Sequence, residues 1–427
     1  MITDFYGKKI LILGKGVSGL GAFEILKRKG ACPTICDEDD LIDALNHKYD
    51  MVVISPSIST KHLIYEYCNN NKVELIGEIE LGYRLTQKPI VAVTGTNGKT
   101  TVCDMCATLL NKKFSAYACG NIGVSFSGIS DSDNDIFVVE TSSFQMESTI
   151  SFAPNVAVIT NLAHDHIDRH GTYEKYVAEK LKIARNLKRC DTLILSYDDI
   201  KVDDLKGLNH DGKTVYVSIG NKVKGAYSLN GKIYWYDEYV CSTDRINLPY
   251  IHNEKNALFA VAVAKIFDVE NRLIAQGLGE FKLRKHRLSV VDRIKSTTFY
   301  NDSKATNISA TISAMRNMSS KYVLILGGSD KRLPFDDIFK INDSNLQLVL
   351  AVGQTAMAIK TTAEKYKIEV KVCSDLSNAV YVAFKSGVEN VLFSPACASF
   401  DSFSSYAERG ENFVRAVKEL KKSEEER

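Results

Sequence analysis

The stretch PIVAVTGTNGKTT, residues 89–101, decides how the middle of the chain folds. It starts with an apolar run that predicts a strand at 90–93, passes through a glycine-containing turn, and then reaches Lys99. A strand, a glycine-rich turn and a helix N-terminus together present backbone N–H groups and a lysine to a triphosphate. The generic phosphate loop has glycine where this chain has Val93, so the stretch is a shortened variant of that loop.

Two residues of this loop have expected roles in binding the nucleotide and its metal ion. The Lys99 ammonium would neutralise the β- and γ-phosphates, and the Thr100 hydroxyl would meet Mg²⁺. The alternative is a chance turn in the same strand–loop–helix context. The predicted loop residues are Gly95, Thr96, Asn97, Gly98, Lys99, Thr100 and Thr101.

Composition places the chain among ordinary globular proteins. Its 427 residues allow two to four domains, and 45% are hydrophobic and 25% charged. The net charge is +2, from 54 basic and 52 acidic residues, so the chain as a whole has no strong electrostatic attraction to nucleic acid or to an anionic membrane. No apolar run is long enough to cross a bilayer, and the N-terminus lacks the features of a secretory signal. We therefore expect no nucleic-acid partner and no membrane insertion.

The ten cysteines are scattered and show no framework spacing. In a chain of this size, that pattern indicates reduced thiols and a cytoplasmic protein. One pair, Cys103 and Cys106, has a metal-like spacing but falls in the helix expected after the phosphate loop. Because no second pair lies nearby, we interpret the two residues as small core side chains rather than zinc ligands.

Alternating patterns along the chain indicate the fold class. Short apolar runs bounded by glycine recur between segments of helical periodicity, which predicts an α/β protein with parallel sheets and crossover helices. Residues 213–250 instead alternate polar and apolar positions and contain Asn230-Gly231, a hairpin signal, so we expect a small antiparallel patch there. The predicted domains are 1–88, 89–286 and 287–427.

A second glycine-rich turn lies near the N-terminus. GKGVSGLG, residues 14–21, directly follows a predicted strand, and Asp37 lies near the end of the next one. This spacing fits a dinucleotide-binding turn. It favours some other nucleotide diphosphate over a nicotinamide cofactor, and tight packing of helix against strand is the third interpretation.

The stretch DIFVVETSSFQME contains a candidate metal ligand. Glu140 ends a strand of the buried type downstream of the phosphate loop, where nucleotide-hydrolysing sheets place a metal-binding carboxylate. A solvated strand end is the alternative. Thr141, Ser142 and Ser143 supply hydroxyl groups directly after it.

The stretch NLAHDHIDRHGTYEKYVAEKLKI combines a crowd of potential metal ligands with a lysine among apolar residues. Five potential ligands crowd a loop after another predicted strand, but a hard cation bound to a nucleotide prefers oxygen, so we expect at most one histidine on the metal. Lys180 then follows among apolar helical positions, and burial should lower its pKa. A neutral amine can capture CO₂ as a carbamate, and a snorkelling surface lysine is the alternative. The five loop residues are His164, Asp165, His166, Asp168 and His170.

In this order, these features resemble the Mur ligase family, the ATP-dependent amide-forming enzymes of peptidoglycan precursor synthesis. The resemblance covers essentially the whole chain. Its markers are TGTNGKTT, GNIG (120–123), ETSSFQME, HDHIDRH with Lys180, HNEKNA (252–257), KHR (285–287), NDSKATN (301–307) and SPACASFDSF (394–403). ETSSFQ and the last two markers most resemble the branch of the family that adds D-glutamate.

The resemblance implies an N-terminal Rossmann-like domain for a UDP-sugar, a central P-loop ATPase domain and a Rossmann-like C-terminal domain for an amino acid. ATP and Mg²⁺ would be the cofactors, and UDP-N-acetylmuramoyl-L-alanine and D-glutamate the substrates. The γ-phosphoryl group would pass to the carboxylate of the L-alanine, and the amine of D-glutamate would attack the acyl phosphate. We expect a monomer.

The resemblance also implies roles for single residues. Lys99, His166 and Lys180 would be catalytic, with Lys180 carbamylated, and Thr100, Glu140, His166 and Lys180 would hold the metal. The remaining nucleotide contacts would be Asn253, Asn256, Arg287, Asp302 and Lys304. The sugar substrate would meet Gly14, Gly16, Ser18, Asp37, Ser55, Asn121 and Ser142, and D-glutamate would meet Lys331, Ser399, Phe400 and Tyr406.

The chain departs from the family pattern on the uridine side. Ser57 stands where the family commonly has glycine, and acidic residues follow Asp37 at 38–40. Three rival functions remain. An oxidoreductase explains only residues 14–21, and a regulatory P-loop switch explains only 89–140. Folylpolyglutamate synthase shares the middle domain but has no need of a UDP-binding domain.

Overall fold

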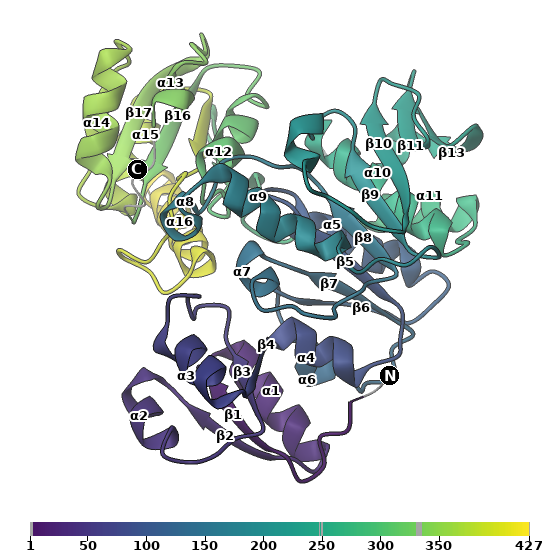
Figure 1. Cartoon of the computed structure of the whole chain (residues 1–427). Helices are drawn as coiled ribbons and strands as arrows, with labels where there is room; N and C mark the ends of the chain where they lie inside the picture. Colours follow the sequence, from purple (N-terminus) through teal and green to yellow (C-terminus); the bar gives the residue numbers. More distant parts are fainter. Residues whose placement is uncertain (1–2, 247, 249–250, 330–334, 427) are drawn as a thin grey trace. The chain divides into compact units, whose positions relative to one another are not determined.

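The computed structural model describes residues 3–246, 248, 251–329 and 335–426. Its contacts divide the chain into two compact units, Met1–Lys282 and Leu283–Arg427. The first unit contains a four-stranded and a nine-stranded sheet, and the second contains a six-stranded sheet (Figure 1). Helices alternate with parallel strands in all three sheets, so the predicted α/β class is confirmed.

The N-terminal sheet is wholly parallel, with strand order β2-β1-β3-β4. Alternate residues of β1 enter two cores: Ile10 and Ile12 pack with helix α1 on one face, whereas Leu11 and Leu13 pack with α3 on the other. The elements are β1 (Lys9–Leu13), α1 (Val17–Arg28), β2 (Cys32–Cys36), η1 (Glu38–Asp40), α2 (Leu41–Ala44), β3 (Met51–Ile54), α3 (Leu63–Asn71), β4 (Glu74–Gly77) and α4 (Glu78–Leu85).

The central sheet has the order β13-β12-β11-β10-β9-β8-β5-β7-β6. Its strands are β5 (Ile90–Thr94), β6 (Ala116–Gly120), β7 (Ile136–Glu140), β8 (Val156–Ile159), β9 (Thr192–Ser196), β10 (Lys213–Ile219), β11 (Gly225–Leu229), β12 (Lys232–Trp235) and β13 (Glu238–Ser242). Strands β5, β7, β8 and β9 are buried along their whole length, as strands covered by helices on both faces should be, whereas β6 at the edge of the sheet is only partly buried.

The predicted antiparallel patch at 213–250 is partly wrong. Strand β10 pairs parallel to β9, and β11 pairs parallel to β10, so both extend the main sheet. Gly225 makes this possible, because a Cβ there would lie 2.1 Å from the carbonyl oxygen of Tyr216. Among the described residues of this range, the antiparallel pairs are β11 with β12 and β12 with β13. The predicted Asn230-Gly231 hairpin is confirmed, with φ of +50° and +72°.

Helices of the central segment cover this sheet. They are α5 (Lys99–Leu110), α6 (Phe126–Ile129), α7 (Ser143–Met146), α8 (Ile167–His170), α9 (Tyr173–Leu181), η2 (Lys182–Ala184), η3 (Val202–Leu205), η4 (Thr243–Arg245), α10 (Ile251–Ile266) and α11 (Asn271–Glu280). On α5, Cys103 and Cys106 are free thiols buried in the core, as predicted. Among the helices of the described residues, none combines the length and the hydropathy needed to cross a bilayer.

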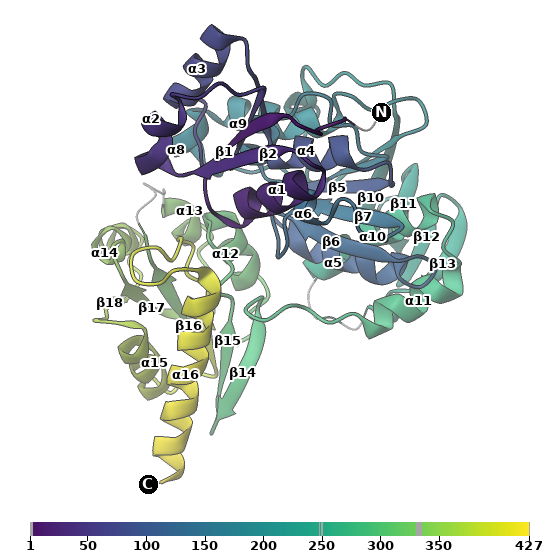
Figure 2. The same ribbon diagram turned by 90° about the horizontal axis from the view of Figure 1, so that it is seen from below.

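The second unit has the sheet order β14-β15-β19-β16-β17-β18, parallel except for the β14–β15 pair. The long helix α16 lies along β14 and β15 (Figure 2), and its Phe413 and Val417 enter the core. The elements are β14 (Ser289–Ile294), β15 (Thr297–Asn301), α12 (Ile308–Met315), β16 (Tyr322–Gly327), α13 (Asp336–Phe339), β17 (Leu346–Val352), α14 (Ala356–Lys365), β18 (Val370–Val372), α15 (Leu376–Lys385), β19 (Asn390–Phe393) and α16 (Tyr406–Glu425).

Candidate active site

Four neighbouring parallel strands of the central sheet end at the same edge, and each is followed by a predicted site segment. The strands are β8, β5, β7 and β6, in that order across the sheet. The phosphate loop follows β5, Thr141 and Ser142 follow β7, and Asn121 follows β6. The loop that contains His166 follows β8. Ligands of α/β proteins bind at this edge, so the topology collects candidates that are far apart in the sequence.

The phosphate loop is shaped by glycines that could not be replaced. Gly95 has φ of +141°, and a Cβ there would lie 2.0 Å from Thr160 Oγ1. Gly98, with φ of +83°, caps α5, and its Cβ would lie 2.7 Å from Asn256 Oδ1. A bare backbone at the start of a twelve-residue helix is the cradle that a phosphate chain requires.

The side chain of Lys99 folds back over this loop. Its Nζ donates to the carbonyl oxygens of Gly95 at 3.0 Å and Thr96 at 2.8 Å. The adjacent Thr100 and Thr101 are both buried in the first turn of α5. The ammonium is therefore held against the loop that would carry the phosphates.

The segment after β8 fixes the loop from one side. Asn161 Oδ1 accepts from the Asn97 backbone N–H at 2.9 Å, and Asn161 Nδ2 donates to the Asn97 carbonyl at 3.0 Å. Thr96 Oγ1 accepts from the Ala163 N–H at 3.0 Å. Asn161 was not predicted, although its place directly after a strand that neighbours β5 was a usable signal.

Glu140 occupies the expected position at the end of β7. Its side chain is buried, and its Oε1 accepts from Asn121 Nδ2 at 3.0 Å. Ser142 caps α7: its Oγ accepts from the Gln145 N–H at 3.2 Å, and the Gln145 side chain returns a contact to the Ser142 N–H at 2.9 Å. The structure thus brings Glu140 and Asn121 together and gives Ser142 a local role.

Lys180 is buried rather than snorkelling. Only 2% of the residue is exposed, and its Nζ donates to the Gly95 carbonyl at 2.6 Å. Burial lowers its pKa far below the ordinary lysine value. The charge of Lys99 lowers it further, and Asp165 and Glu140 oppose the shift only in part. This confirms that the pKa of Lys180 falls, so the amine is neutral in a larger share of molecules than a surface lysine is.

Tyr176 shares this environment and was not predicted. Its hydroxyl lies 3.0 Å from Thr96 Oγ1, and the Lys180 ammonium lies 4.8 Å from the centre of its ring. Burial raises the pKa of Tyr176, so the hydroxyl stays protonated and can donate. Its spacing of four residues from Lys180 on α9 puts both side chains on one helix face.

Of the five potential ligands after β8, the four whose side chains the structure describes do not form one cluster. His164 stacks on Tyr173 with ring centres 4.4 Å apart, and the buried His170 lies 3.0 Å from Ser143 Oγ. His166 has a left-handed backbone, with φ of +52°, and its Nε2 lies 3.7 Å from Asp165 Oδ2. The side chain of Asp168 lies outside the described part.

Within the described residues, no group of three or more His, Cys, Asp or Glu side chains lies close enough to hold a metal ion. A metal held at this edge by the described side chains would take some of its donors from other groups. Threonine hydroxyl, carbamate and phosphate oxygens are suited to a hard cation.

Helix α10 contributes the two predicted asparagines. Asn253 and Asn256 are both buried, and α10 packs against α5. Asn256 reaches the phosphate loop, because its Oδ1 is the atom nearest to the position of a Cβ on Gly98. The structure therefore brings the HNEKNA motif to the start of α5.

The N-terminal segment forms the predicted glycine turn. Gly14, with φ of +106°, packs so closely on Ser55 that a Cβ would lie 2.4 Å from Ser55 Oγ. Gly16 is the N-cap of α1, whose first turn contains Ser18, and Asp37 Oδ1 accepts from the Lys15 N–H at 2.8 Å. These residues therefore lie around one turn.

Two departures from the family pattern have structural explanations. Ser57 does not need the conformation that glycine would provide, because its φ is negative. Within the segment, Lys15 partly neutralises the acidic run, because its Nζ lies 2.7 Å from Asp40, and His62 Nε2 lies 2.8 Å from Glu38.

The second unit contains the remaining candidates. Asp302 accepts from the Leu288 N–H at 3.1 Å and from Ser394 Oγ at 2.8 Å, and burial raises its pKa to about 7 although the positive charge of Arg287 opposes the shift. The Lys304 ammonium lies 3.9 Å from the centre of the Tyr406 ring. Ser399 is buried, Phe400 is 76% exposed, and Lys331 lies outside the described residues.

Arg409 was not predicted from the sequence. Its guanidinium is buried and donates to the carbonyls of Ala398 at 3.0 Å and Ser303 at 2.9 Å. It therefore joins the loop before Ser399 to the loop that contains Asp302 and Lys304. Nothing in its local sequence distinguishes it from a surface arginine of an amphipathic helix.

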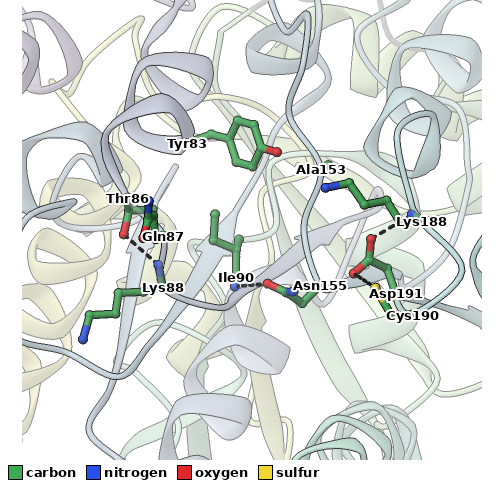
Figure 3. A pocket seen from close by; sticks show the side chains of 10 residues that line it. All are labelled: Tyr83, Thr86, Gln87, Lys88, Ile90, Ala153, Asn155, Lys188, Cys190 and Asp191. Carbon is green, nitrogen blue, oxygen red and sulfur yellow. Dashed lines mark hydrogen bonds between the residues drawn. The ribbon is translucent and has the colours of Figure 1, made fainter. Parts of the chain in front are cut away.

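A pocket of about 310 Å³ lies at the N-terminal ends of the central strands, opposite to the ends that carry the predicted site (Figure 3). It lies where β5, β8 and β9 begin, and there Asn155 Oδ1 accepts from the Ile90 N–H at 2.9 Å. None of the predicted site residues lines it. Its lining residues are Tyr83, Thr86, Gln87, Lys88, Ile90, Ala153, Asn155, Lys188, Cys190 and Asp191.

Comparison with solved structures shows the fold that these sites share. The structure matches a pseudomurein peptide ligase type C from Methanothermus fervidus with a TM-score of 0.64 and 18% identity, covering 97% of this chain and 100% of that one. It matches the MurF ligase of Thermotoga maritima in complex with ADP with a TM-score of 0.59 and 14% identity, covering 99% and 98%. The three-domain α/β architecture is that of such ligases, whereas the predicted boundaries at 88 and 286 stay predictions.

Sequence comparison is more specific. Residues 93–264 match the Mur ligase middle domain. The UDP-N-acetylmuramoylalanine–D-glutamate ligase of Enterococcus faecalis is 35% identical over 454 residues, covering 99% of both chains. The enzyme of the same name from Lactococcus lactis is 36% identical over 449 residues, again with 99% of each covered. This chain belongs to the Mur ligase family of ATP-dependent ligases.

Proposed function

We propose that this protein joins D-glutamate to UDP-N-acetylmuramoyl-L-alanine at the expense of ATP, a step of peptidoglycan precursor synthesis. The observation that carries the proposal is the contact of two lysines, Lys99 and the buried Lys180, with one carbonyl of the phosphate loop. The full-length similarity to ligases named for this reaction supports the choice of substrates.

The chemistry needs an activated carboxylate. A carboxylate is a poor electrophile, so the γ-phosphoryl group of ATP is transferred to an oxygen of the L-alanine carboxylate, and ADP leaves. The amine of D-glutamate then attacks the carbonyl carbon, and the tetrahedral intermediate collapses to amide and phosphate. The protein mainly positions the reactants and compensates charge, with Lys99 and the backbone N–H groups of the loop on the phosphates.

The residues at the sheet edge suit Mg²⁺. Thr100, Glu140, His166 and the carbamate of Lys180 would hold it, since hydroxyl and carboxylate oxygens are the donors that Mg²⁺ prefers. Bound there, Mg²⁺ would neutralise part of the phosphate charge. The buried carboxylate of Glu140 and the low pKa of Lys180 support this assignment.

The remaining assignments follow the three segments. The first would bind the UDP end through Gly14, Gly16, Ser18, Asp37 and Ser55, and Asn121 and Ser142 would meet its acyl end. Asn253, Asn256, Arg287, Asp302 and Lys304 would bind the nucleotide. D-glutamate would meet Lys331, Ser399, Phe400 and Tyr406. We propose 1–88, 89–286 and 287–427 as the domains of a cytoplasmic monomer.

Phosphate release with a panel of amino acids tests the substrate. With ATP, Mg²⁺ and UDP-N-acetylmuramoyl-L-alanine, D-glutamate should support turnover roughly 10⁴-fold better than L-lysine or diaminopimelate, because a diamino acid would leave polar groups of the site unpaired. It would also bring an ammonium toward Lys331, and like charges in a closed site are disfavoured.

Two controls accompany the panel. Reactions without the sugar nucleotide measure uncoupled ATP hydrolysis, and Lys331→Glu should impair the use of D-glutamate specifically. Equal turnover with L-glutamate, or a preference for a diamino acid, would contradict the proposed step.

A further inference from the structure

Arg169 joins its own helix to two segments that lie far from it in the sequence. Its Nη1 donates to the Ser57 carbonyl at 3.2 Å, and its Nη2 donates to the Ile58 carbonyl at 3.0 Å. Nη2 also lies 2.6 Å from Glu147 Oε2, and the guanidinium carbon lies 4.1 Å from the centre of the Phe144 ring. The side chain is only 16% exposed. One guanidinium thus joins the turn after β3, helix α7 and its own helix α8.

On one side, Arg169 is tied to the turn that carries His166. The Arg169 N–H donates to the His166 carbonyl at 3.2 Å, and the ring of Phe144 lies against both side chains, 4.7 Å from the His166 ring. The same loop reaches the phosphate loop, because Thr96 Oγ1 accepts from the Ala163 N–H at 3.0 Å. Contacts therefore run without a gap from the phosphate loop to Arg169.

On the other side, Arg169 is tied to the turn after β3, which packs on the glycine turn of the first segment. Its partners there are backbone carbonyls, so the contact depends on the conformation of the turn and not on the side chains at 57 and 58. Within that turn the Ile58 N–H donates to the Ser55 carbonyl at 3.1 Å, and Ser55 Oγ donates to the Gly14 carbonyl at 3.4 Å. A ligand that orders this turn would therefore act on the carbonyls that hold Arg169.

We propose that Arg169 is a positioning residue that couples binding at the Gly14 and Ser55 turn to the arrangement of the turn that carries His166. The inference rests on the proposed function, in which a sugar nucleotide occupies the first site and an ATP–metal complex the second. Coupling is reciprocal: if Arg169 transmits it, each ligand strengthens the binding of the other by the same factor.

Calorimetry on the full chain tests the coupling. The Kd of UDP-N-acetylmuramoyl-L-alanine is measured with and without saturating Mg²⁺ and a non-hydrolysable ATP analogue. In the unmodified protein the nucleotide should tighten this Kd about fivefold or more. The ratio of the Kd without nucleotide to the Kd with nucleotide measures the coupling. In Arg169→Lys this ratio should fall below about twofold, because an ammonium keeps the charge but lacks the planar fork that reaches both carbonyls and Glu147 together. Each ligand alone should bind within about threefold of the unmodified protein.

Two further variants sharpen the test. Glu147→Gln keeps the shape of the side chain but removes the charge that anchors Arg169 to α7, so the Kd ratio of this variant should also fall. If Arg169→Lys does not fold, Glu147→Gln replaces it in the test. Arg185→Lys is the matched control, because Arg185 Nη2 likewise donates to two carbonyls, those of Thr149 and Ile150, both at 3.0 Å and both in the segment after α7. The Kd ratio of Arg185→Lys should equal that of the unmodified protein.

Two results would overturn the inference. One is the absence of coupling in the unmodified protein. The other is an unchanged ratio in Arg169→Lys, including the case in which the Kd rises equally with and without nucleotide, which is the mark of a merely structural role. A protein that does not bind the sugar nucleotide at all would instead contradict the proposed function.

Discussion

Lys99→Ala is expected to lower the rate of phosphate release by about 10³-fold or more, because it removes the main positive charge on the phosphate loop where charge shifts in the transition state. In the structure the Lys99 ammonium lies against the carbonyls of Gly95 and Thr96, so it is already placed on the loop and needs little rearrangement to compensate that charge. The loss should appear in kcat more than in the KM of either acid substrate. Steady-state phosphate release measures it.

The control for this variant is Lys112→Ala. Lys112 lies just after the end of α5, the helix that begins at Lys99, and it pairs with Glu280. Removal of this lysine should therefore leave turnover nearly unchanged. Binding of the sugar nucleotide should survive in Lys99→Ala, because that site is assigned to the first segment. Loss of sugar-nucleotide binding in the variant would show that the assignment of domains to substrates is wrong.

Lys180→Ala is expected to lose most activity, roughly 10²-fold or more by the scale of ligand losses at metal sites. The side chain is buried beside the phosphate loop and its pKa is far below that of an ordinary lysine, which favours the reaction of the neutral amine with CO₂ to give a carbamate and a proton. Alanine removes the oxygens that the carbamate would place near the metal.

Short carboxylates should restore part of the activity of Lys180→Ala, since acetate or formate can enter the space left by the side chain and supply an oxygen ligand. Lys182→Ala is the matched control, because Lys182 is two residues away, partly exposed and paired with Glu179. Near-normal turnover of Lys180→Ala without any additive would contradict the carbamate. So would a complete lack of rescue in a variant that still binds nucleotide.

The parts of the site that could be predicted are those encoded by neighbours in sequence. The phosphate loop is such a part, since its strand, glycines and helix start lie within thirteen residues. Lys180 could be predicted because its apolar helical neighbours are adjacent on one face, and burial and the low pKa followed from them. The fold class was predictable for the same reason, because the period of each short segment determines its type.

The parts that could not be predicted depend on contacts between distant segments. Arg169 and its partner Ser57 are 112 positions apart, and Arg409 and its partner Ser303 are 106 apart. The crowd of histidines and aspartates after β8 looked like one cluster, but the ring of His164 stacks on Tyr173 whereas His170 lies beside Ser143 Oγ. The parallel pairing of β11 depends on a close backbone approach at Gly225, which alternation alone does not reveal.

Transfer of an isotope label tests the central claim most directly. UDP-N-acetylmuramoyl-L-alanine is prepared with both oxygens of its free carboxylate replaced by a heavy isotope, and it is turned over with unlabelled ATP and D-glutamate. If the acid is activated by phosphorylation, the oxygen that bridges carbon and phosphorus leaves with the phosphate. Each released phosphate should then contain one labelled oxygen, and the new amide should keep the other. Phosphate that contains no label, with amide formed at the normal rate, would contradict the account.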